Sequence, residues 1–135
     1  MQTTETGYVR DWEKLASLDA EFAVLSHGHK RFGAWSQDDF YQTGSDEIDS
    51  FYDDLSRLGA PSEFKSALDF GCGLGRLSLA LRKRIPEVVG VDVSPTMVER
   101  SRGRFGEVTG LRFVLNQTKD LAQFADGSFD LVFSL

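Results

Sequence analysis

The sequence predicts an α/β domain with a doubly wound parallel sheet, preceded by a helical N-terminal extension. Three observations support this fold class. From residue 66 onward, short apolar runs alternate with segments of helical period. The run at 88–93 is apolar on both faces, as in a parallel strand that is covered from both sides. The connections between runs are short, which is typical of strand–helix–strand units.

Residues 1–60 form the predicted extension. The apolar residues of segment 11–25 recur at three- and four-residue spacing: Trp12, Leu15, Leu18 and Phe22. This spacing predicts a helix with one apolar face. A loop at 27–37 contains His27 and His29, which we interpret as surface residues because no cysteine or spaced carboxylate accompanies them.

A second helix is expected to begin near Thr43, because Thr43 and Asp46 have the spacing of a capping box. Its apolar residues again follow a helical period: Ile48, Phe51, Tyr52, Leu55 and Leu58. Gly59 and Pro61 are typical of a helix end. We divide the chain here into the extension, 1–60, and the sheet domain, 61–135, although the linker at 59–65 is too short for independent domains.

The sheet domain is expected to contain four strands, at residues 67–70, 88–93, 111–115 and 129–135. A helix follows the first strand and extends to about Arg84. Its apolar positions face inward: Leu74, Leu77, Leu81 and Ile85. Ser94 and Pro95 begin the next helix, with the serine as N-cap and the proline at the first helical position.

The composition limits the class of protein. Of 135 residues, 41% are hydrophobic and 27% charged, as in a soluble globular protein. No apolar run approaches the roughly 18–20 residues of a membrane span, and the polar N-terminus lacks a signal-peptide pattern. Cys72 is the single cysteine, so we expect a cytoplasmic protein without an internal disulfide. The net charge of −6 argues against a nucleic-acid partner.

The turn after the first strand contains the candidate binding residues. It carries three glycines, at Gly71, Gly73 and Gly75. Glycines at this place let the backbone turn sharply and let a ligand approach closely. A dinucleotide fingerprint needs a glycine at the sixth place, where this chain has Arg76. Asp69 lies just before the turn, and its carboxylate favours a cationic ligand over a pyrophosphate.

Asp92 ends the second strand, where a carboxylate can accept two hydrogen bonds from a ribose diol. The pattern therefore favours a ligand with a ribose and a positive group and without phosphate. S-adenosylmethionine has these properties, because it is an adenosine that carries a sulfonium and an α-ammonium group.

At this point the sequence resembles the class I S-adenosylmethionine-dependent methyltransferases. LDFGCGLGR resembles their first motif, VVGVDVSPTMVERSR the segment after it, and FADGSFDLVFSL their fourth-strand segment. The three blocks cover residues 66–135 in the family's order. The resemblance implies a Rossmann-like sheet with strand order 3-2-1-4, S-adenosylmethionine as cofactor, and methyl transfer as the activity.

The resemblance also implies roles for individual residues. Asp69 and the turn formed by Gly71, Cys72, Gly73, Leu74 and Gly75 would hold the methionine moiety. Asp92 would hold the ribose hydroxyls, with Val93 and Met97 near the adenine. Asp120 and Leu121 are the candidates for the acidic contact to the adenine amino group and its apolar neighbour, with Asn116 as a rival.

No catalytic base and no metal-ligating set is identifiable in the sequence, and we expect a small-molecule acceptor. Two other functions stay open. One is a non-catalytic or truncated S-adenosylmethionine-binding module. The other is an NAD(P)-dependent oxidoreductase, which Arg76 and Asp69 disfavour.

The fourth predicted strand reaches the last residue, Leu135. In the resembled fold further strands and helices follow it. We therefore expect this chain to be a fragment of a longer enzyme, or to self-associate through the open edge of that strand.

Overall fold

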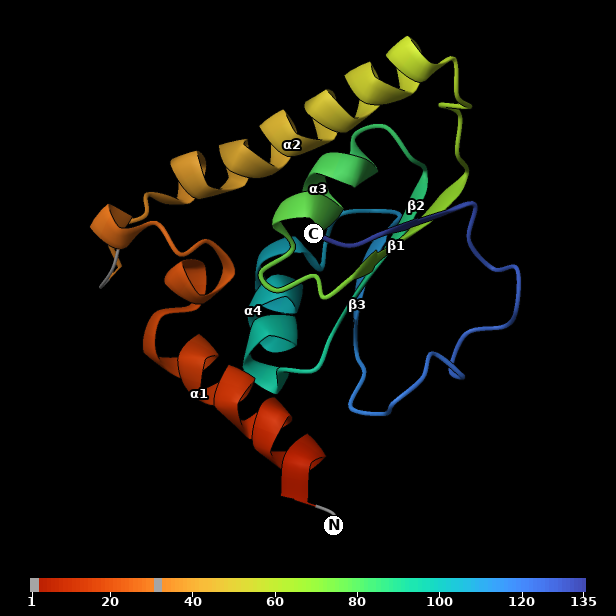
Figure 1. Ribbon diagram of the computed structural model, residues 1–135. Coiled ribbons are helices and arrows are strands. Elements are labelled where there is room, and N and C mark those ends of the chain that lie inside the picture. The colour runs from red at the N-terminus through yellow and green to blue at the C-terminus, as the bar shows by residue number, and fades with distance from the viewer. Residues whose placement is uncertain (1–2, 31–32) are drawn as a thin grey trace.

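The computed structural model describes residues 3–30 and 33–135 and has the expected α/β architecture (Figure 1). Two long helices come first, and four strands then alternate with two shorter helices. In chain order the elements are α1 (Thr3–Val24), η1 (Gly28–Lys30), α2 (Gln37–Leu58), β1 (Ser66–Phe70), α3 (Arg76–Arg82), β2 (Glu87–Asp92), α4 (Pro95–Phe105), β3 (Leu111–Leu115) and β4 (Leu131–Phe133). Among these described residues, no helix is both long and apolar enough to cross a membrane.

The four strands form one parallel sheet in the order β3-β2-β1-β4, which confirms the predicted topology. The register pairs Asp69 with Gly90 and Asp92 with Leu115. Because the strands are parallel, the carboxyl ends of β1, β2 and β3 lie at the same edge of the sheet. The turn after β1 and the residues that follow β2 and β3 therefore meet there.

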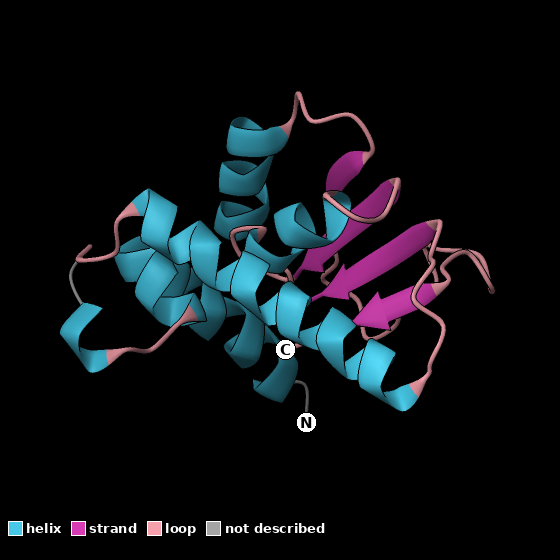
Figure 2. Cartoon of the chain, turned by 90° about the horizontal axis from the view of Figure 1, so that it is seen from above, coloured by secondary structure: helices cyan, strands magenta, loops and turns pink. Residues whose placement is uncertain are grey.

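The two faces of the sheet are covered differently. The helices gather on one side of it, while segment 116–130 crosses the other side as a loop (Figures 1 and 2). On the helical side, Ala67, Val88 and Phe113 pack with Leu77 and Leu81 of α3. On the loop side, a smaller cluster joins Leu68, Val89 and Val91 to Leu121, Phe124 and Phe129.

The second helix begins at Gln37, so the predicted start near Thr43 is wrong. Ser36 is the N-cap, and its hydroxyl accepts a hydrogen bond from the Asp39 amide. Thr43 lies inside the helix, where its hydroxyl donates to the Phe40 carbonyl at 2.6 Å. The predicted end is confirmed, because Gly59 adopts the left-handed conformation and caps the last turn.

The apolar face predicted for the first helix is wrong at two positions. Leu15 and Leu18 are 47% and 74% exposed, whereas Ala16 and Ala20 are buried. The side chain of Phe22 lies outside the described residues. Asp19 interrupts the helix with an extended backbone (φ −157°, ψ 86°), so α1 consists of two helical pieces. The small alanines let α1 pack closely on the rest of the chain, which a spacing of large apolar residues does not predict.

Helices α2 and α3 touch at Gly44. A Cβ atom at this position would lie 2.3 Å from the Arg76 carbonyl oxygen. The Arg76 side chain is buried in this interface and donates a hydrogen bond to the Thr43 hydroxyl at 3.2 Å. Glycine at position 44 is therefore required for the close approach of the two helices.

We expect Gly44→Ala to lower the free energy of unfolding by about 1–3 kcal/mol, because α2 must move away from α3 to admit the methyl group. The control is Gly103→Ala in α4, where a Cβ atom would meet nothing within 4 Å. That substitution should raise the free energy of unfolding by about 0.5–1 kcal/mol. Urea denaturation of both variants measures the difference, and equal effects would contradict the packing argument.

Candidate functional site

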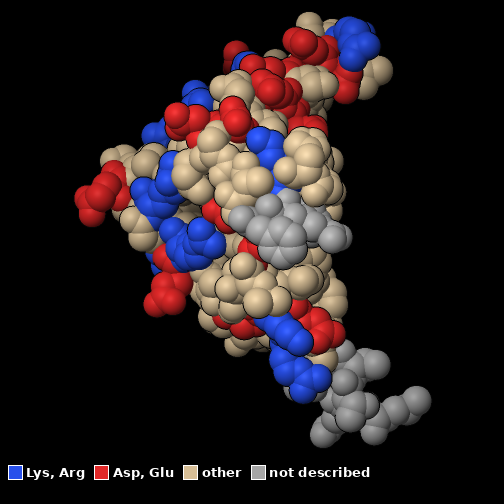
Figure 3. Space-filling view, turned by 90° about the vertical axis from the view of Figure 1, so that its left-hand side faces the viewer, with Lys and Arg blue, Asp and Glu red and all other residues tan. Residues whose placement is uncertain are grey.

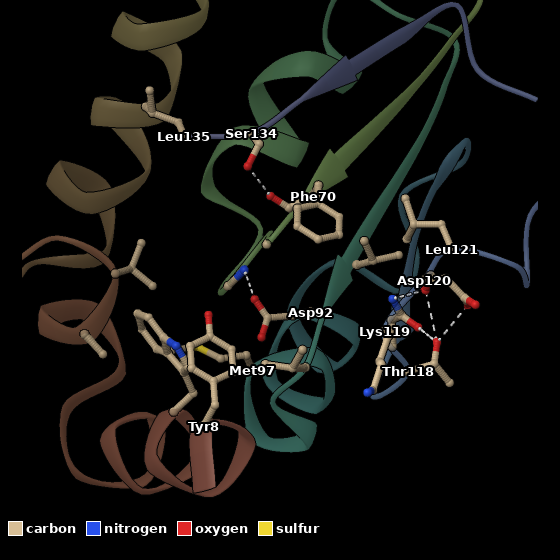
Figure 4. A pocket seen from close by; sticks show the side chains of 18 residues that line it. Tyr8, Phe70, Asp92, Met97, Thr118, Lys119, Asp120, Leu121, Ser134 and Leu135 are labelled. Carbon is tan, nitrogen blue, oxygen red and sulfur yellow. Dashed lines mark hydrogen bonds between the residues drawn. The ribbon is translucent and has the colours of Figure 1, made fainter. Parts of the chain in front are cut away.

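A cavity of about 670 Å³ opens at the carboxyl ends of the strands. Its wall draws on α1, on the turn after β1, on the residues that follow β2 and β3, and on those after β4 (Figure 4). The lining residues are Tyr8, Trp12, Ala23, Val24, Phe70, Gly71, Gly73, Val91, Asp92, Val93, Met97, Asn116, Thr118, Lys119, Asp120, Leu121, Ser134 and Leu135. The volume lies in the range of sites that bind a cofactor or another small molecule.

Asp92 lies in the middle of this cavity and is held by two backbone amides. One carboxylate oxygen accepts a hydrogen bond from Gly73 N–H at 2.8 Å, and the other accepts one from Ser94 N–H at 2.9 Å. A carboxylate oxygen has more than one acceptor site, so both oxygens can also accept hydrogen bonds from a ligand. The two amides therefore fix the orientation of the carboxylate before any ligand binds.

The glycine turn adopts the conformation that its sequence predicts. Gly71, Gly73 and Gly75 have φ angles of 75°, 52° and 78°, in the left-handed region that favours glycine. The amides of Gly71 and Cys72 both donate to the Val91 carbonyl, which joins the turn to β2. Gly71 and Gly73 both line the cavity with backbone atoms. A Cβ atom on Gly71 would meet nothing within 4 Å, whereas one on Gly73 would lie 2.9 Å from the Val24 side chain.

The remaining predicted residues of the turn are buried outside the cavity wall: Cys72, Leu74 and Gly75. Burial raises the pKa of the Cys72 thiol well above its usual value, and the charges of Asp69 and Asp92 act in the same direction. The thiol therefore stays protonated at neutral pH. Its contribution to the site is to fill the space beneath the turn.

Asp69 is placed differently from the sequence-based expectation. The side chain is 1% exposed and is not among the residues that line the cavity. Its carboxylate accepts a hydrogen bond from the Ser78 hydroxyl at 2.6 Å, on the helical side of the sheet. Side chains alternate along a strand, so Asp69 shares this face with Ala67. The Asp69 side chain therefore does not reach the cavity, where direct contact with a ligand was expected, and its carboxylate instead joins β1 to α3 through Ser78.

The cavity wall also contains the predicted adenine-side residues. Val93, Met97 and Leu121 line it together with Asn116 and Asp120. The Asn116 amide group donates to the Asp120 carbonyl at 3.0 Å, and its oxygen accepts from the Thr118 hydroxyl at 2.8 Å. The exposed Asp120 carboxylate accepts from the Ala122 amide at 3.1 Å. The structure thus places both candidates for the contact to the adenine amino group, Asp120 and Asn116, in the wall of the same cavity.

Several residues of the wall were not among the predicted site residues. From α1 come Tyr8 and Trp12, whose rings meet edge to face with centroids 6.2 Å apart. Phe70, Ser134 and Leu135 come from the ends of β1 and β4. The sequence offers a weak signal for the first pair, since two aromatic residues four positions apart share a helix face. Nothing in the local pattern shows that this face meets the glycine turn.

The histidines of the loop before α2 do not join the site. The His27 ring lies 5.9 Å from the His29 ring and 5.4 Å from Trp35, away from the residues that line the cavity. In the part of the chain that the structure describes, no group of three or more histidine, cysteine, aspartate or glutamate side chains could hold a metal ion.

Comparison with known proteins gives consistent matches. A family model described as a methyltransferase domain matches residues 67–135. The 23S rRNA (uracil(1939)-C(5))-methyltransferase RlmD of Polaromonas naphthalenivorans is 33% identical over 91 residues, which make up 65% of this chain and 19% of that protein. This chain spans less than a fifth of the length of several curated relatives that it matches.

Solved structures match over most of the chain. Magnesium protoporphyrin IX methyltransferase (ChlM) from Synechocystis PCC 6803, with bound SAH, superimposes with a TM-score of 0.57 at 26% identity, over 96% of this chain and 57% of that one. Haemonchus contortus phosphoethanolamine N-methyltransferase 1, in complex with phosphoethanolamine and S-adenosylhomocysteine, has a TM-score of 0.67 at 17% identity, over 96% and 25% of the two chains. The second match shows a common fold.

The buried Asp69 carboxyl predicts a pH-dependent stability. Burial raises its pKa to about 6, against the opposing effects of the Ser78 hydrogen bond and the Arg76 charge. Between about pH 4 and pH 6 the unfolded chain releases this proton and the folded chain retains it. The free energy of unfolding should therefore fall with rising pH relative to that of Asp69→Asn, and the difference should level off above about pH 6.

Because of this raised pKa, we expect the free energy of unfolding of Asp69→Asn to exceed that of the wild type by roughly 3 kcal/mol at neutral pH. Asparagine retains an oxygen that accepts the Ser78 hydrogen bond, so the comparison isolates the charge. Urea denaturation of both proteins from pH 4 to pH 8 measures the difference. A constant difference across this range would show that Asp69 does not titrate there.

Proposed function

Because the chain belongs to the family of S-adenosylmethionine-dependent methyltransferases, we propose that it binds S-adenosylmethionine in the cavity at the carboxyl ends of the strands. The residues present fit this cofactor. Gly71 leaves room for a closely approaching ligand, because a Cβ atom there would meet nothing within 4 Å, and the cavity of about 670 Å³ has the size of a cofactor site. We further propose that the protein transfers the methyl group to a small molecule.

The observation that carries the proposal is the position of Asp92 beside Gly71 and Gly73. A carboxylate that is already oriented by two amides can accept both hydroxyls of a ribose without reorganisation. The ribose at Asp92 would direct the methionine end of the cofactor along the backbone of Gly71 and Gly73. The adenine would then lie toward Val93, Met97 and Leu121.

Asp120 is the better candidate for the adenine amino group. Both polar ends of the Asn116 side chain are occupied by Asp120 and Thr118. The Asp120 carboxylate lies exposed on the same wall. We therefore assign the amino-group contact to Asp120 and a supporting role to Asn116, which holds the loop in place.

S-adenosylmethionine supplies a methyl group on a sulfonium, which is a good leaving group. The residues of this chain then have to position the cofactor and exclude water from the reacting end of the cavity. Orientation of the reactants can account for roughly 7–11 kcal/mol of the barrier. Tyr8, Trp12 and Leu135 line the same cavity as the glycine turn and are the candidates for this positioning. Tyr8 and Leu135 lie on opposite sides of the cavity (Figure 4).

A small-molecule acceptor is supported by the charge distribution. The net charge is −6, and acidic side chains gather over α2 at the top of the molecule (Figure 3). Along its whole length α2 carries one basic residue, Arg57, and seven exposed acidic residues: Asp38, Asp39, Asp46, Glu47, Asp49, Asp53 and Asp54. This surface would repel a phosphate backbone. Methylation of an RNA, as the name of the RlmD relative describes for that protein, is the outcome that would overturn this part of the proposal.

We expect Asp92→Asn to weaken the binding of S-adenosylhomocysteine about 10- to 100-fold, because it removes charge-assisted hydrogen bonds to the ribose. Titration calorimetry measures both affinities. The matched control is Asp126→Asn, which removes an exposed acid outside the cavity wall. Equal affinities of wild type and Asp92→Asn would exclude the ribose assignment, and stabilisation of the wild type by NAD instead of S-adenosylhomocysteine would exclude the cofactor.

A further inference from the structure

Glu13 of α1 joins the N-terminal extension to the sheet domain across 81 residues of sequence. Its carboxylate accepts hydrogen bonds from the Ser94 hydroxyl at 2.5 Å and from the Thr96 amide at 3.2 Å, and it also accepts one from the Thr96 hydroxyl. Ser94 is the N-cap of α4 and Thr96 lies in its first turn, where the helix dipole also favours a negative charge. Glu13 of α1 therefore accepts hydrogen bonds from donors at the N-terminus of another helix, α4.

The titration of Glu13 agrees with this arrangement. Burial by itself raises the pKa of the carboxyl, and the hydrogen bonds from Ser94 and Thr96 outweigh it. The pKa is therefore lowered from its ordinary value, and the carboxylate is ionised at neutral pH. Charge-assisted hydrogen bonds are stronger than neutral ones, so the Glu13 carboxylate is a strong attachment point for α1.

The two pieces of α1 are attached to different partners. The piece after Asp19 is held by Glu21, whose carboxylate accepts from Gln37 at 2.9 Å and from Arg100 at 3.1 Å. It also packs tightly on the glycine turn, where a Cβ atom on Gly73 would lie 2.9 Å from Val24. The piece before Asp19 contains Glu13 and carries its contact to Ser94 and Thr96.

The first piece of α1 also carries Tyr8 and Trp12, which line the cavity (Figure 4). Tyr8 is five residues and Trp12 one residue before Glu13, so the attachment of Glu13 determines where both rings lie. Ser94 connects this attachment to the site, because its hydroxyl contacts Glu13 and its amide contacts Asp92. Ser94 therefore couples the positions of the Tyr8 and Trp12 rings to the position of the Asp92 carboxylate.

We propose that Glu13 is a positioning residue that latches the first piece of α1 onto α4 and thereby holds Tyr8 and Trp12 over the cofactor cavity. Asp19 is the hinge about which this piece moves when the latch is broken. The inference rests on the proposed function where it concerns cofactor retention. The latch itself is a property of the free protein and can be tested without any ligand.

The first experiment is amide hydrogen exchange of the ligand-free protein. Glu13→Ala should accelerate exchange in residues 3–18 about 10- to 100-fold, the loss expected for hydrogen bonds to a charged group, and leave α2 unchanged. Asp11→Asn, which alters an exposed acid of the same helix piece, is the control and should exchange like the wild type. Unchanged exchange in Glu13→Ala, or equal acceleration in α1 and α2, would overturn the latch.

A second variant changes the α4 partner of the contact with Glu13. Thr96→Val removes a hydroxyl that contacts Glu13 and changes no residue of α1 itself. If the latch exists, the effects of Glu13→Ala and Thr96→Val on exchange in residues 3–18 are not additive. Additive effects would contradict it.

The third measurement concerns the cofactor. In stopped-flow experiments, Glu13→Ala should raise the dissociation rate constant of S-adenosylhomocysteine about tenfold while its association rate constant stays within twofold of the wild type. An unchanged dissociation rate would exclude the role in cofactor retention. Failure of the wild type to bind S-adenosylhomocysteine would refute the proposed function, and the exchange experiment would still decide the latch.

Discussion

The rest of the site depends on the two hydrogen bonds that the Asp92 carboxylate accepts from Gly73 and Ser94. They join three segments at the carboxyl end of β2: the strand itself, the glycine turn after β1 and the start of α4. A negative charge at this point also favours the N-terminus of α4. Asp92 is therefore a structural element of the turn, and the same orientation leaves it facing the cavity as a hydrogen-bond acceptor for a ligand.

Hydrogen bonds to three different elements hold the glycine turn in place. Val91 accepts its first two amides, the Ser101 hydroxyl donates to the Gly73 carbonyl at 3.0 Å, and the Tyr41 hydroxyl donates to the Leu74 carbonyl at 3.0 Å. These partners come from β2, α4 and α2. A turn that is fixed by so many neighbours presents its backbone to a ligand without reorganisation, which is the requirement for positioning a reactive cofactor. The helical extension is thus part of the site as well as a cover for it.

Much of the fold followed from local signals. Ser94 caps α4, Gly59 ends α2, and the strands lie within two residues of their expected starts, because caps, left-handed glycines and short apolar runs act over a few neighbouring residues. The predicted start of α2 was wrong because two positions compete as local signals. Ser36 and Thr43 both have the chemistry of a cap, and only the packing of Phe40 and Gly44 places the helix start at the earlier residue.

The sequence by itself determined the conformation of the glycine turn and the place of Asp92 at the carboxyl end of the second strand, since both depend on chain-local patterns and on the fixed geometry of parallel strands. The sheet order and the placement of Asp120 on the same cavity followed from the resemblance of the three sequence blocks to the methyltransferase motifs. Only the tertiary structure decided that Asp69 faces Ser78 instead of the cavity, that Leu15 and Leu18 lie exposed, and that Tyr8 and Trp12 reach the site. The reason is physical. These positions depend on the direction in which α1 crosses α4 and on which side of β1 meets α3, and both are set by contacts between residues that are far apart in the chain.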